Sequence, residues 1–375
     1  MPDPSLPDLP RVLILPSSIG LANRTIGGGE RYAAEYTRAL ARITHAEQAL
    51  FSDRPEAPPA GGPPTRVLPW KLRPGGIFPP LTREARAALA EYDVLHVMCF
   101  PNTVADGFLA CGLLQRQQVV LTDIGGGGRC VSTYLNRLSP RLNPYRLADG
   151  LAHLSHHAAG LFDGWKNPAT ILHGGARPLF PPETGRFDGY ALFVGRLLAH
   201  KGVLEVIQAL PLGRELRIVG RPYDTAYFEK LRTAADGRRV TFLTDADDSE
   251  LARQYQGASV VLQPSLPTTG SREDRSELLG LVAIEAQAAG KPVIVTQTTS
   301  LPELVQDGVT GRIVPPHDRQ ALHDALESFL GNPAHARRIG ANALQHATAH
   351  FTWDAVARRG MEFYRTLAAR RRAGA

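Results

Sequence analysis

Cysteines are few and long apolar runs are missing from this sequence, and each absence excludes a class of protein. The three cysteines, Cys99, Cys111 and Cys130, are odd in number and lack metal-ligand spacing, which argues against a disulfide framework or a zinc site. No run of ~18 apolar residues occurs, so we expect no membrane-spanning helix. Residues 1–10 are proline-rich and acidic, unlike a signal peptide. We therefore expect a cytoplasmic protein that begins with a disordered tail over residues 1–10.

Size and composition indicate a globular chain with more than one core. The 375 residues suit two domains of ~150 to 200 residues each, and 43% hydrophobic with 21% charged residues is the balance of a folded protein. The formal net charge of +6 is modest. Near the end, Arg370, Arg371 and Arg372 stand beside an apolar helical face. This pattern suits peripheral contact with an anionic membrane, and equally a frayed, solvated terminus.

Short apolar runs alternate with amphipathic stretches of helix length, which predicts an α/β protein with parallel sheets. A run rich in proline and glycine around Ile171 to Pro182 divides two such series. We expect two doubly wound, Rossmann-like domains that face each other across a cleft, with ligands at the carboxyl ends of the strands. The expected strands are 11–16, 66–69, 94–98 and 119–122 in the first series, and 191–194, 216–219, 240–243, 260–263, 292–295 and 312–314 in the second.

Three loops contain residues that suit an anionic ligand, and the first is the glycine-rich turn that precedes Glu30. Glycines at a helix start let backbone amides approach a phosphate, so Gly28 and Gly29 are candidate phosphate-binding residues. The spacing differs from that of dinucleotide-binding and P-loop motifs. A tight turn that merely allows close packing explains these glycines equally well.

The second loop follows the strand that ends at Val194 and contains Gly195, Arg196 and Lys201. A diphosphate leaving group gains negative charge as its bond to a sugar breaks, and two fixed cations stabilise that charge in the transition state. Arg196 suits two phosphate oxygens, whereas Lys201 acts as a point charge. Solvated surface charges are the alternative interpretation. Gly195, together with Gly220 after the next strand, is expected to line the same binding site.

The third loop leads into the stretch from Glu277 to Gly290. Two glutamates, Glu277 and Glu285, would lie ~80° apart on a continuous helix, so they need separate roles. We expect Glu277 in a loop, Gly280 at the opening turn of a helix and Glu285 within that helix. Glu277 would hold sugar hydroxyls and Glu285 a ribose diol; a glycosidase also uses paired carboxylates. The amides expected to point toward a diphosphate belong to Leu279, Gly280 and Leu281.

A set of motifs in the second half is shared with a known family. They are Gly195-Arg-Leu-x3-Lys-Gly, Pro264-Ser265, Glu277-x7-Glu285, the run Leu301–Gly311, and Phe351-Thr352-Trp353. They resemble family 4 of the retaining glycosyltransferases with the GT-B fold. The likeness is dense over residues 190–364 and thinner before them.

The resemblance implies roles for the candidate residues. Arg196 and Lys201 would bind the diphosphate of a nucleoside-diphosphate sugar, Glu277 would contact the donor sugar and Glu285 the ribose. Transfer would need no metal and no other cofactor, and would retain the anomeric configuration. The implied segments are an acceptor-side domain at 11–175, a linker at 176–189, a donor-side domain at 190–350 and a helix at 351–375 that crosses back to the first domain.

One position departs from the family pattern. Many members have a histidine in a Thr-x-His sequence after a first-domain strand, whereas Thr122-Asp123-Ile124 has isoleucine there, so the histidine's role is not carried over. Asp123 is a candidate to meet the acceptor hydroxyl, with a turn-forming role as the alternative. His96 is expected to be a hydrogen-bonded core residue. Asp245 and Asp247 are expected to serve turn and helix-cap roles rather than bind a metal.

The sequence thus predicts a glycosyltransferase that moves a sugar from a UDP- or GDP-sugar to an acceptor, in glycan, glycolipid or exopolysaccharide synthesis. The expected partners are the sugar nucleotide and a sugar, lipid-linked or small-molecule acceptor, with no nucleic acid. Peripheral contact with the inner face of the cell membrane is compatible with the basic end of the chain. Two alternatives stay open: a binding module without turnover, and a phosphorylase or epimerase on the same architecture.

Overall fold

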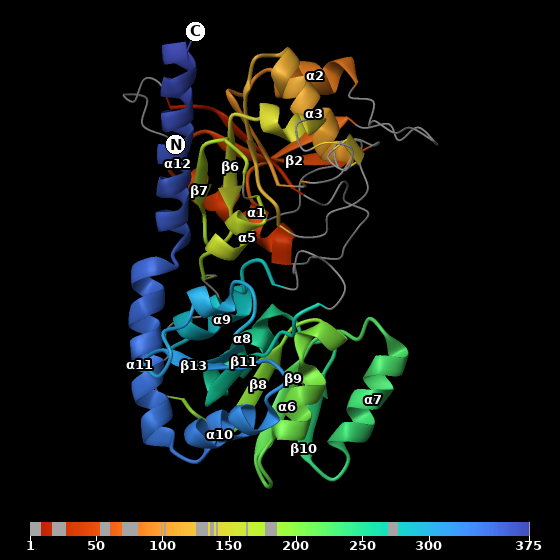
Figure 1. The fold of residues 1–375 in the computed structure, drawn as a ribbon, viewed down its shortest axis with the longest axis vertical. Coiled ribbons are helices and arrows are strands. Elements are labelled where there is room, and N and C mark those ends of the chain that lie inside the picture. Colours follow the sequence, from red (N-terminus) through yellow and green to blue (C-terminus); the bar gives the residue numbers. More distant parts are fainter. Residues whose placement is uncertain are drawn as a thin grey trace. The chain divides into compact units, whose positions relative to one another are not determined.

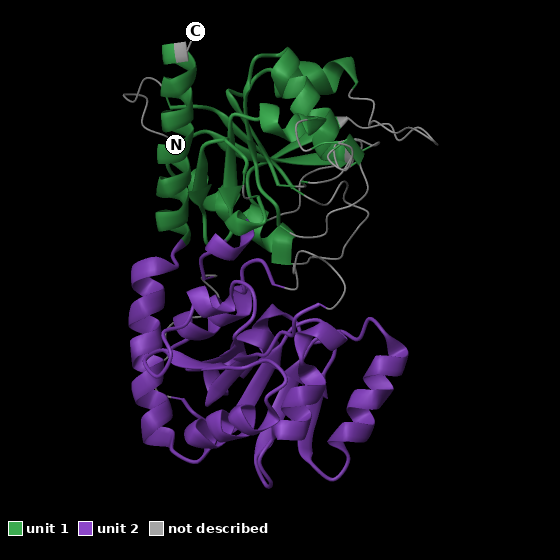
Figure 2. Ribbon diagram, viewed as in Figure 1, with its two compact units in different colours: residues 1–154, 159–173, 353–375 green, residues 155–158, 174–352 purple. Residues whose placement is uncertain are grey.

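The computed structural model divides the chain into two compact units (Figure 2). Unit 1 comprises Met1–Leu154, Ala159–His173 and Trp353–Ala375, and unit 2 comprises Ser155–Ala158 and Gly174–Thr352. The structure describes residues 9–16, 28–52, 61–69, 82–98, 100, 103–124, 134–135, 139, 142–162, 164–176, 186–268 and 277–374. Most of the expected tail, most of the expected linker, Cys99 and Cys130 lie outside the described residues. The remaining cysteine, Cys111, is a buried free thiol.

Unit 1 is built on a parallel sheet whose strands follow the order β3-β2-β1-β4-β5-β6-β7 in the described part of the chain (Figure 1). Strands β1, β4 and β5 are buried throughout, because their apolar side chains are covered on both faces. The strands are β1 (Val12–Leu15), β2 (Ala46–Ser52), β3 (Thr65–Pro69), β4 (Val94–Val97), β5 (Gln118–Leu121), β6 (Gly150–His153) and β7 (Ala169–Ile171).

The last helix of the chain, α12, packs within unit 1 against α1. A Cβ added at Gly360 of α12 would lie 1.9 Å from the Tyr36 hydroxyl on α1, so the two helices approach closely at this point. Phe363 and Leu367 of α12 also lie against Gly150, where β6 begins. The helices of unit 1 are α1 (Gly28–Leu40), α2 (Arg83–Leu89), α3 (Thr103–Leu114), η2 (Pro144–Leu147) and α12 (Trp353–Gly374). The short helix α5 (His156–Gly160) is divided between the units, since Ser155–Ala158 belong to unit 2.

Unit 2 repeats the plan with a parallel sheet in the order β10-β9-β8-β11-β12-β13. Its strands are β8 (Tyr190–Val194), β9 (Glu215–Val219), β10 (Arg239–Leu243), β11 (Val260–Gln263), β12 (Val293–Thr296) and β13 (Gly311–Val314). Its helices are η3 (Ala199–Lys201), α6 (Val203–Ala209), α7 (Thr225–Ala235), α8 (Asp248–Gly257), α9 (Leu281–Ala288), η4 (Leu301–Glu303), α10 (Arg319–Leu330) and α11 (Pro333–His350). The predicted α/β class with two Rossmann-like domains is confirmed.

The strand predictions were right where apolar runs are continuous and incomplete elsewhere. All ten expected strands exist, within one or two residues of the expected bounds. Three were missed: β2, which contains the half-buried polar residues Glu47 and Gln48, β6, which begins with glycine, and the short edge strand β7. Ile171, expected in the loop run between the domains, belongs to β7, where an edge position needs few ladder hydrogen bonds.

A chain of buried hydrogen bonds connects α1 and α12 to the sheet of unit 1. The hydroxyls of Tyr36 and Tyr364 lie 3.0 Å apart, and the Tyr364 hydroxyl lies 2.7 Å from Nδ1 of His96. Nε2 of His96 lies 2.6 Å from the Thr122 hydroxyl. All four residues are buried. His96 is thus a hydrogen-bonded core residue, as expected, and burial lowers its pKa to about 3.

The stability of unit 1 should fall as the pH drops below ~6.5, the ordinary histidine pKa. The unfolded chain then binds a proton at His96 that the folded chain excludes, so the loss continues down to about pH 3. We expect His96→Gln, which keeps hydrogen-bonding groups but does not titrate, to remove about 1.4 kcal/mol per pH unit from the slope of unfolding free energy between pH 4 and 6. Urea titrations at several pH values measure this slope. An unchanged slope in the variant contradicts the assignment.

Candidate functional site

The candidate residues of unit 2 gather where its strand order reverses. The chain runs from β8 outward to β9 and β10, and then returns to add β11 on the other side of β8. The loops after β8 and β11 therefore diverge at this point, which is where open parallel sheets bind ligands. Arg196 and Lys201 follow β8, whereas Ser265 and Glu277 follow β11. The backbone amide of Leu266 donates to the His200 carbonyl (2.7 Å), which holds the two loops together.

Lys201 and Glu277 form the central contact of the site. Nζ of Lys201 lies 2.7 Å from Oε2 of Glu277, and both side chains are only 16% exposed. The Ser265 hydroxyl donates to the same carboxylate oxygen at 3.3 Å, and the Ser300 hydroxyl donates to the Glu277 carbonyl at 3.0 Å. The structure thus brings together a cation and a carboxylate that are 76 residues apart in the sequence.

Arg196 differs from Lys201 in its surroundings. Its side chain is exposed, and its guanidinium carbon lies 5.8 Å from the centre of the Tyr223 ring. Within the described part of the chain Arg196 makes no ion pair. A guanidinium held over an aromatic face keeps its N–H groups available in the ring plane for an anion.

The start of α9 carries amides that lack acceptors. Gly280 stands at the N-cap with φ of 92°, and Leu278, Leu279 and Gly280 are buried. The Ala283 amide is satisfied by the Gln263 side chain (2.9 Å). The amides at this helix start that have no acceptor among the described residues include those of Leu279, Gly280 and Leu281. Because a buried amide without a partner is costly, this helix start suits an anion such as a phosphate.

Glu285 lies within α9, as expected, and is 5% exposed. Oε2 of Glu285 accepts a hydrogen bond from the Tyr255 hydroxyl at 3.0 Å. Gly290 follows the helix with φ of 70°, as expected for a C-terminal stop. Sequence reasoning missed Tyr255, which no local motif marks, and it used Ser265 only as part of a family motif.

Gly195 and Gly220 have a packing reason for being glycine. A Cβ at Gly220 would lie 1.8 Å from the Gly195 carbonyl oxygen, so the turns after β8 and β9 meet backbone to backbone. This approach lies beside Arg196 and holds the start of its loop in place. The sequence could indicate the glycines but not this partnership, since the two positions are 25 residues apart in the chain.

The candidate residues of unit 1 lie at the carboxyl ends of its own strands. Gly28 and Gly29 open α1, and Asp123 follows β5 and is buried. A Cβ at Gly29 would lie 2.8 Å from Cδ1 of Ile124, so Ile124 packs directly against Gly29. Close packing therefore accounts for Gly29 without a ligand.

Asp247 and Ser155 cap the starts of helices. The Asp247 carboxylate accepts from the Glu250 amide (2.7 Å) at the start of α8, as expected. The Ser155 hydroxyl accepts from the Ala158 amide (3.0 Å) and donates to the Leu278 carbonyl (2.8 Å). Over the described ranges no cluster of three or more His, Cys, Asp or Glu side chains suits a metal ion. In the same part of the chain no helix combines the length and apolarity needed to cross a bilayer.

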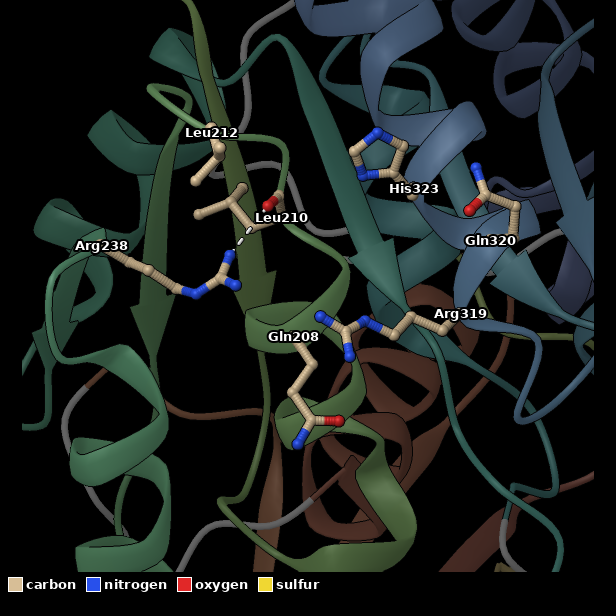
Figure 3. Close-up of a pocket in the computed structure, with 7 residues that line it drawn as sticks. All are labelled: Gln208, Leu210, Leu212, Arg238, Arg319, Gln320 and His323. Atoms are coloured by element: carbon tan, nitrogen blue, oxygen red, sulfur yellow. Dashed lines mark hydrogen bonds between the residues drawn. The ribbon is translucent and has the colours of Figure 1, made fainter.

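A pocket of about 550 Å³ lies at the opposite edge of the second sheet (Figure 3). Leu210 and Leu212 precede β9 and Arg238 precedes β10, so the pocket is at the amino ends of the strands, away from Arg196 and Lys201. It is not part of the candidate site. The residues that line it are Gln208, Leu210, Leu212, Arg238, Arg319, Gln320 and His323.

The comparisons with known proteins agree with this arrangement. Residues 183–346 match the family described as "Glycosyl transferases group 1". Sucrose-phosphate synthase from Thermosynechococcus elongatus has the same fold, with a TM-score of 0.71, 24% identity, and coverage of 96% of this chain and 99% of that one. HepE from Anabaena, solved with UDP and glucose, has a TM-score of 0.71 and 19% identity, with coverage of 95% of this chain and 100% of that one. The fold is the predicted GT-B fold.

A curated relative supports the class of protein. D-inositol 3-phosphate glycosyltransferase from Corynebacterium diphtheriae is 38% identical over 179 residues, which cover 44% of this chain and 39% of that protein. The matches thus span less than half of the first curated relatives' length. The resemblance to glycosyltransferases predicted from the sequence is confirmed.

The left-handed glycine at the start of α9 gives a test of how this site is built. Both Gly280 (φ 92°) and Gly308 (φ 73°) occupy the left-handed region, but a Cβ at Gly280 would lie 2.8 Å from Leu301 and Leu304, whereas a Cβ at Gly308 would meet nothing within 4 Å. We expect Gly308→Ala to cost about 1 to 2 kcal/mol of unfolding free energy, and Gly280→Ala about 1 to 3 kcal/mol more. Urea unfolding of both variants measures the difference. Equal losses contradict the packing at Gly280.

Proposed function

We propose that the chain is a retaining glycosyltransferase that moves a sugar from a UDP- or GDP-sugar to an acceptor hydroxyl. One observation carries the proposal: three acceptorless amides at the start of α9 belong to the same edge of unit 2 as Arg196, Lys201 and Glu277. Amides and fixed cations together suit a diphosphate. HepE, which has the same fold, was solved with UDP and glucose, which supports a uridine nucleotide as donor.

In the proposed complex the diphosphate lies on the amides of Leu279, Gly280 and Leu281. Lys201 then gains a phosphate as a second anionic partner, and Arg196 supplies two parallel N–H donors. The Glu277 carboxylate, already in contact with Lys201 and Ser265, accepts from hydroxyls of the donor sugar. Glu285 accepts from the ribose, with Tyr255 holding its carboxylate in place.

The proposed reaction breaks the bond between the anomeric carbon and the phosphate oxygen, and the bonding electrons leave with the diphosphate. The acceptor oxygen forms the new bond on the same face, and its proton passes to the departing phosphate oxygen. Arg196 and Lys201 stabilise the charge that the diphosphate gains, which lowers the barrier more than it tightens ground-state binding. No metal is needed, because these cations occupy the role that a divalent ion has elsewhere.

The proposed acceptor is a hydroxyl of a sugar, a lipid-linked sugar or a small polyol. The curated relative named above acts on D-inositol 3-phosphate according to its name, and the solved neighbour is a sucrose-phosphate synthase. The first name gives a phosphorylated polyol, and the second gives a phosphorylated sugar as the product. Phosphorylated polyols and sugars are therefore the first acceptors to test, before glycan and glycolipid acceptors.

Removing any one of the three charged groups should slow transfer while leaving the fold intact. We expect Arg196→Ala, Lys201→Ala and Glu277→Ala each to lower kcat/KM by ~10²-fold, the usual effect of losing a transition-state contact. Arg232→Ala is the matched control, since Arg232 is an exposed arginine of unit 2 paired with Glu229. Initial rates with labelled UDP- and GDP-sugars measure the effect. Wild-type rates in all three variants contradict the proposed site.

The products of the same assay separate the proposal from its alternatives. Transfer with the donor's anomeric configuration, read by NMR of the product, agrees with the proposal. Inversion contradicts retention. Phosphorolysis, epimerisation, or donor binding without turnover would replace the proposal by one of the other activities.

Metal independence can be tested on its own. We expect transfer by the purified protein to be unchanged by excess EDTA, because Arg196 and Lys201 supply the positive charge. A loss of activity that Mg²⁺ or Mn²⁺ restores would contradict this part of the proposal.

A further inference from the structure

Two leucines project into solvent at the end of α3 in unit 1. Leu114 is 86% exposed and Leu113 is 39% exposed, although α3 is otherwise an apolar helix with a buried side. A third leucine, Leu147, is 64% exposed at the end of η2, which packs against α3. Exposed apolar groups that gather at one place commonly mark an interaction surface.

The turn that carries these leucines is held rigidly. The Gln117 amide donates to the Gly112 carbonyl (2.8 Å), and the Gln117 side chain donates to the carbonyls of Leu89 and Tyr92 (both 2.6 Å). Arg116 has φ of 57°, a conformation that non-glycine residues rarely adopt. These bonds hold the turn that follows Leu114 against the end of α2 and the residues before β4.

Arginines surround the leucines, and they come from distant parts of the sequence. Arg371, near the end of α12, donates to the Arg116 carbonyl at 3.1 Å and lies 3.5 Å from Asp149, two residues after Leu147. The flanking Arg370 and Arg372 are exposed, as is Arg116. Arg86 is also near, because its carbonyl accepts from the Gln115 side chain at 2.9 Å. We call this surface the basic leucine patch: Leu113, Leu114, Arg116, Leu147, Arg370, Arg371 and Arg372.

We propose that the basic leucine patch docks unit 1 onto an anionic phospholipid surface. Leucines enter the boundary between headgroups and acyl chains, while arginines at the same height meet lipid phosphates. Charge complementarity selects this occupant, because the acids near the turn are already paired: Asp149 with Arg371, and Glu91 with Arg11 and Arg66. The cytoplasmic leaflet carries the required negative potential. The inference goes beyond the proposed transfer reaction and does not depend on it.

Sedimentation with vesicles tests the patch directly. We expect the full chain to bind vesicles of phosphatidylglycerol and phosphatidylcholine, to bind pure phosphatidylcholine weakly, and to be released by salt. Leu114→Ser should lower the partition coefficient roughly tenfold, the effect of no longer burying one leucine. The double variant Arg370→Gln/Arg372→Gln should lower it by ~5-fold for each arginine removed.

Matched controls come from unit 2. Leu212 is 90% exposed, so Leu212→Ser removes an equally exposed leucine, and Arg232→Gln removes an exposed arginine; both should leave vesicle binding unchanged. Equal losses in Leu212→Ser and Leu114→Ser overturn the proposal, as does equal binding to both kinds of vesicle. Self-association without vesicles that Leu114→Ser abolishes would overturn it in favour of a second copy as the partner. Lys201→Ala should bind vesicles normally, so failure of the docking surface is distinguishable from failure of the proposed transfer.

Discussion

The ion pair between Lys201 and Glu277 is the contact on which the site of unit 2 depends. A lysine and a glutamate that are each 16% exposed have lost much of their hydration, and their attraction at 2.7 Å offsets that loss. The pair joins the loop after β8 to the segment that precedes α9. The loops after β8 and β11 are therefore held together before any ligand arrives. This reduces the ordering that a bound donor would have to impose.

In the proposed complex the same pair binds an anion and a sugar together. The phosphate is then a further negative partner for Lys201, so the lysine need not leave Glu277 to contact it. Glu277 keeps its remaining lone pairs for hydroxyl groups, because Lys201 and Ser265 both contact Oε2. An anion site and a hydroxyl site thus share one charge-neutral core, at the edge of a sheet whose strands are fixed by burial.

The sequence predicted those parts of the fold and site that depend on local pattern. Continuous apolar runs located β8, β11 and β12. The helix start signal at Gly280 and the stop signal at Gly290 placed Glu285 correctly within α9. It could not predict contacts set by the tertiary fold. The Lys201–Glu277 pair spans 76 residues, and the Tyr36–Tyr364 contact spans 328. The sequence also did not predict strands that contain polar residues or glycine, such as β2 and β6, because their burial is imposed by neighbouring strands.

In unit 1, Ile124 has a packing role. Ile124 lies against Gly29, and a larger residue at position 29 would collide with its side chain. By the resemblance, many members of the family have a histidine at the position of Ile124. In this chain that position contributes an apolar contact between the start of α1 and the residues after β5.

In the proposed reaction the acceptor hydroxyl has to lose its proton to a nearby group. Asp123, the titratable neighbour of Ile124, is buried and has interactions of its own. A general base has to reach the reacting hydroxyl, either directly or through one water. A carboxylate that is 3% exposed meets that requirement poorly. The departing phosphate, by contrast, is adjacent to the acceptor oxygen by necessity in a reaction on the same face. Its negative charge rises as the bond to the sugar breaks, so its affinity for a proton grows when the acceptor must lose one. The burial of Asp123 therefore agrees with the proposed reaction, in which the departing phosphate itself removes the acceptor's proton.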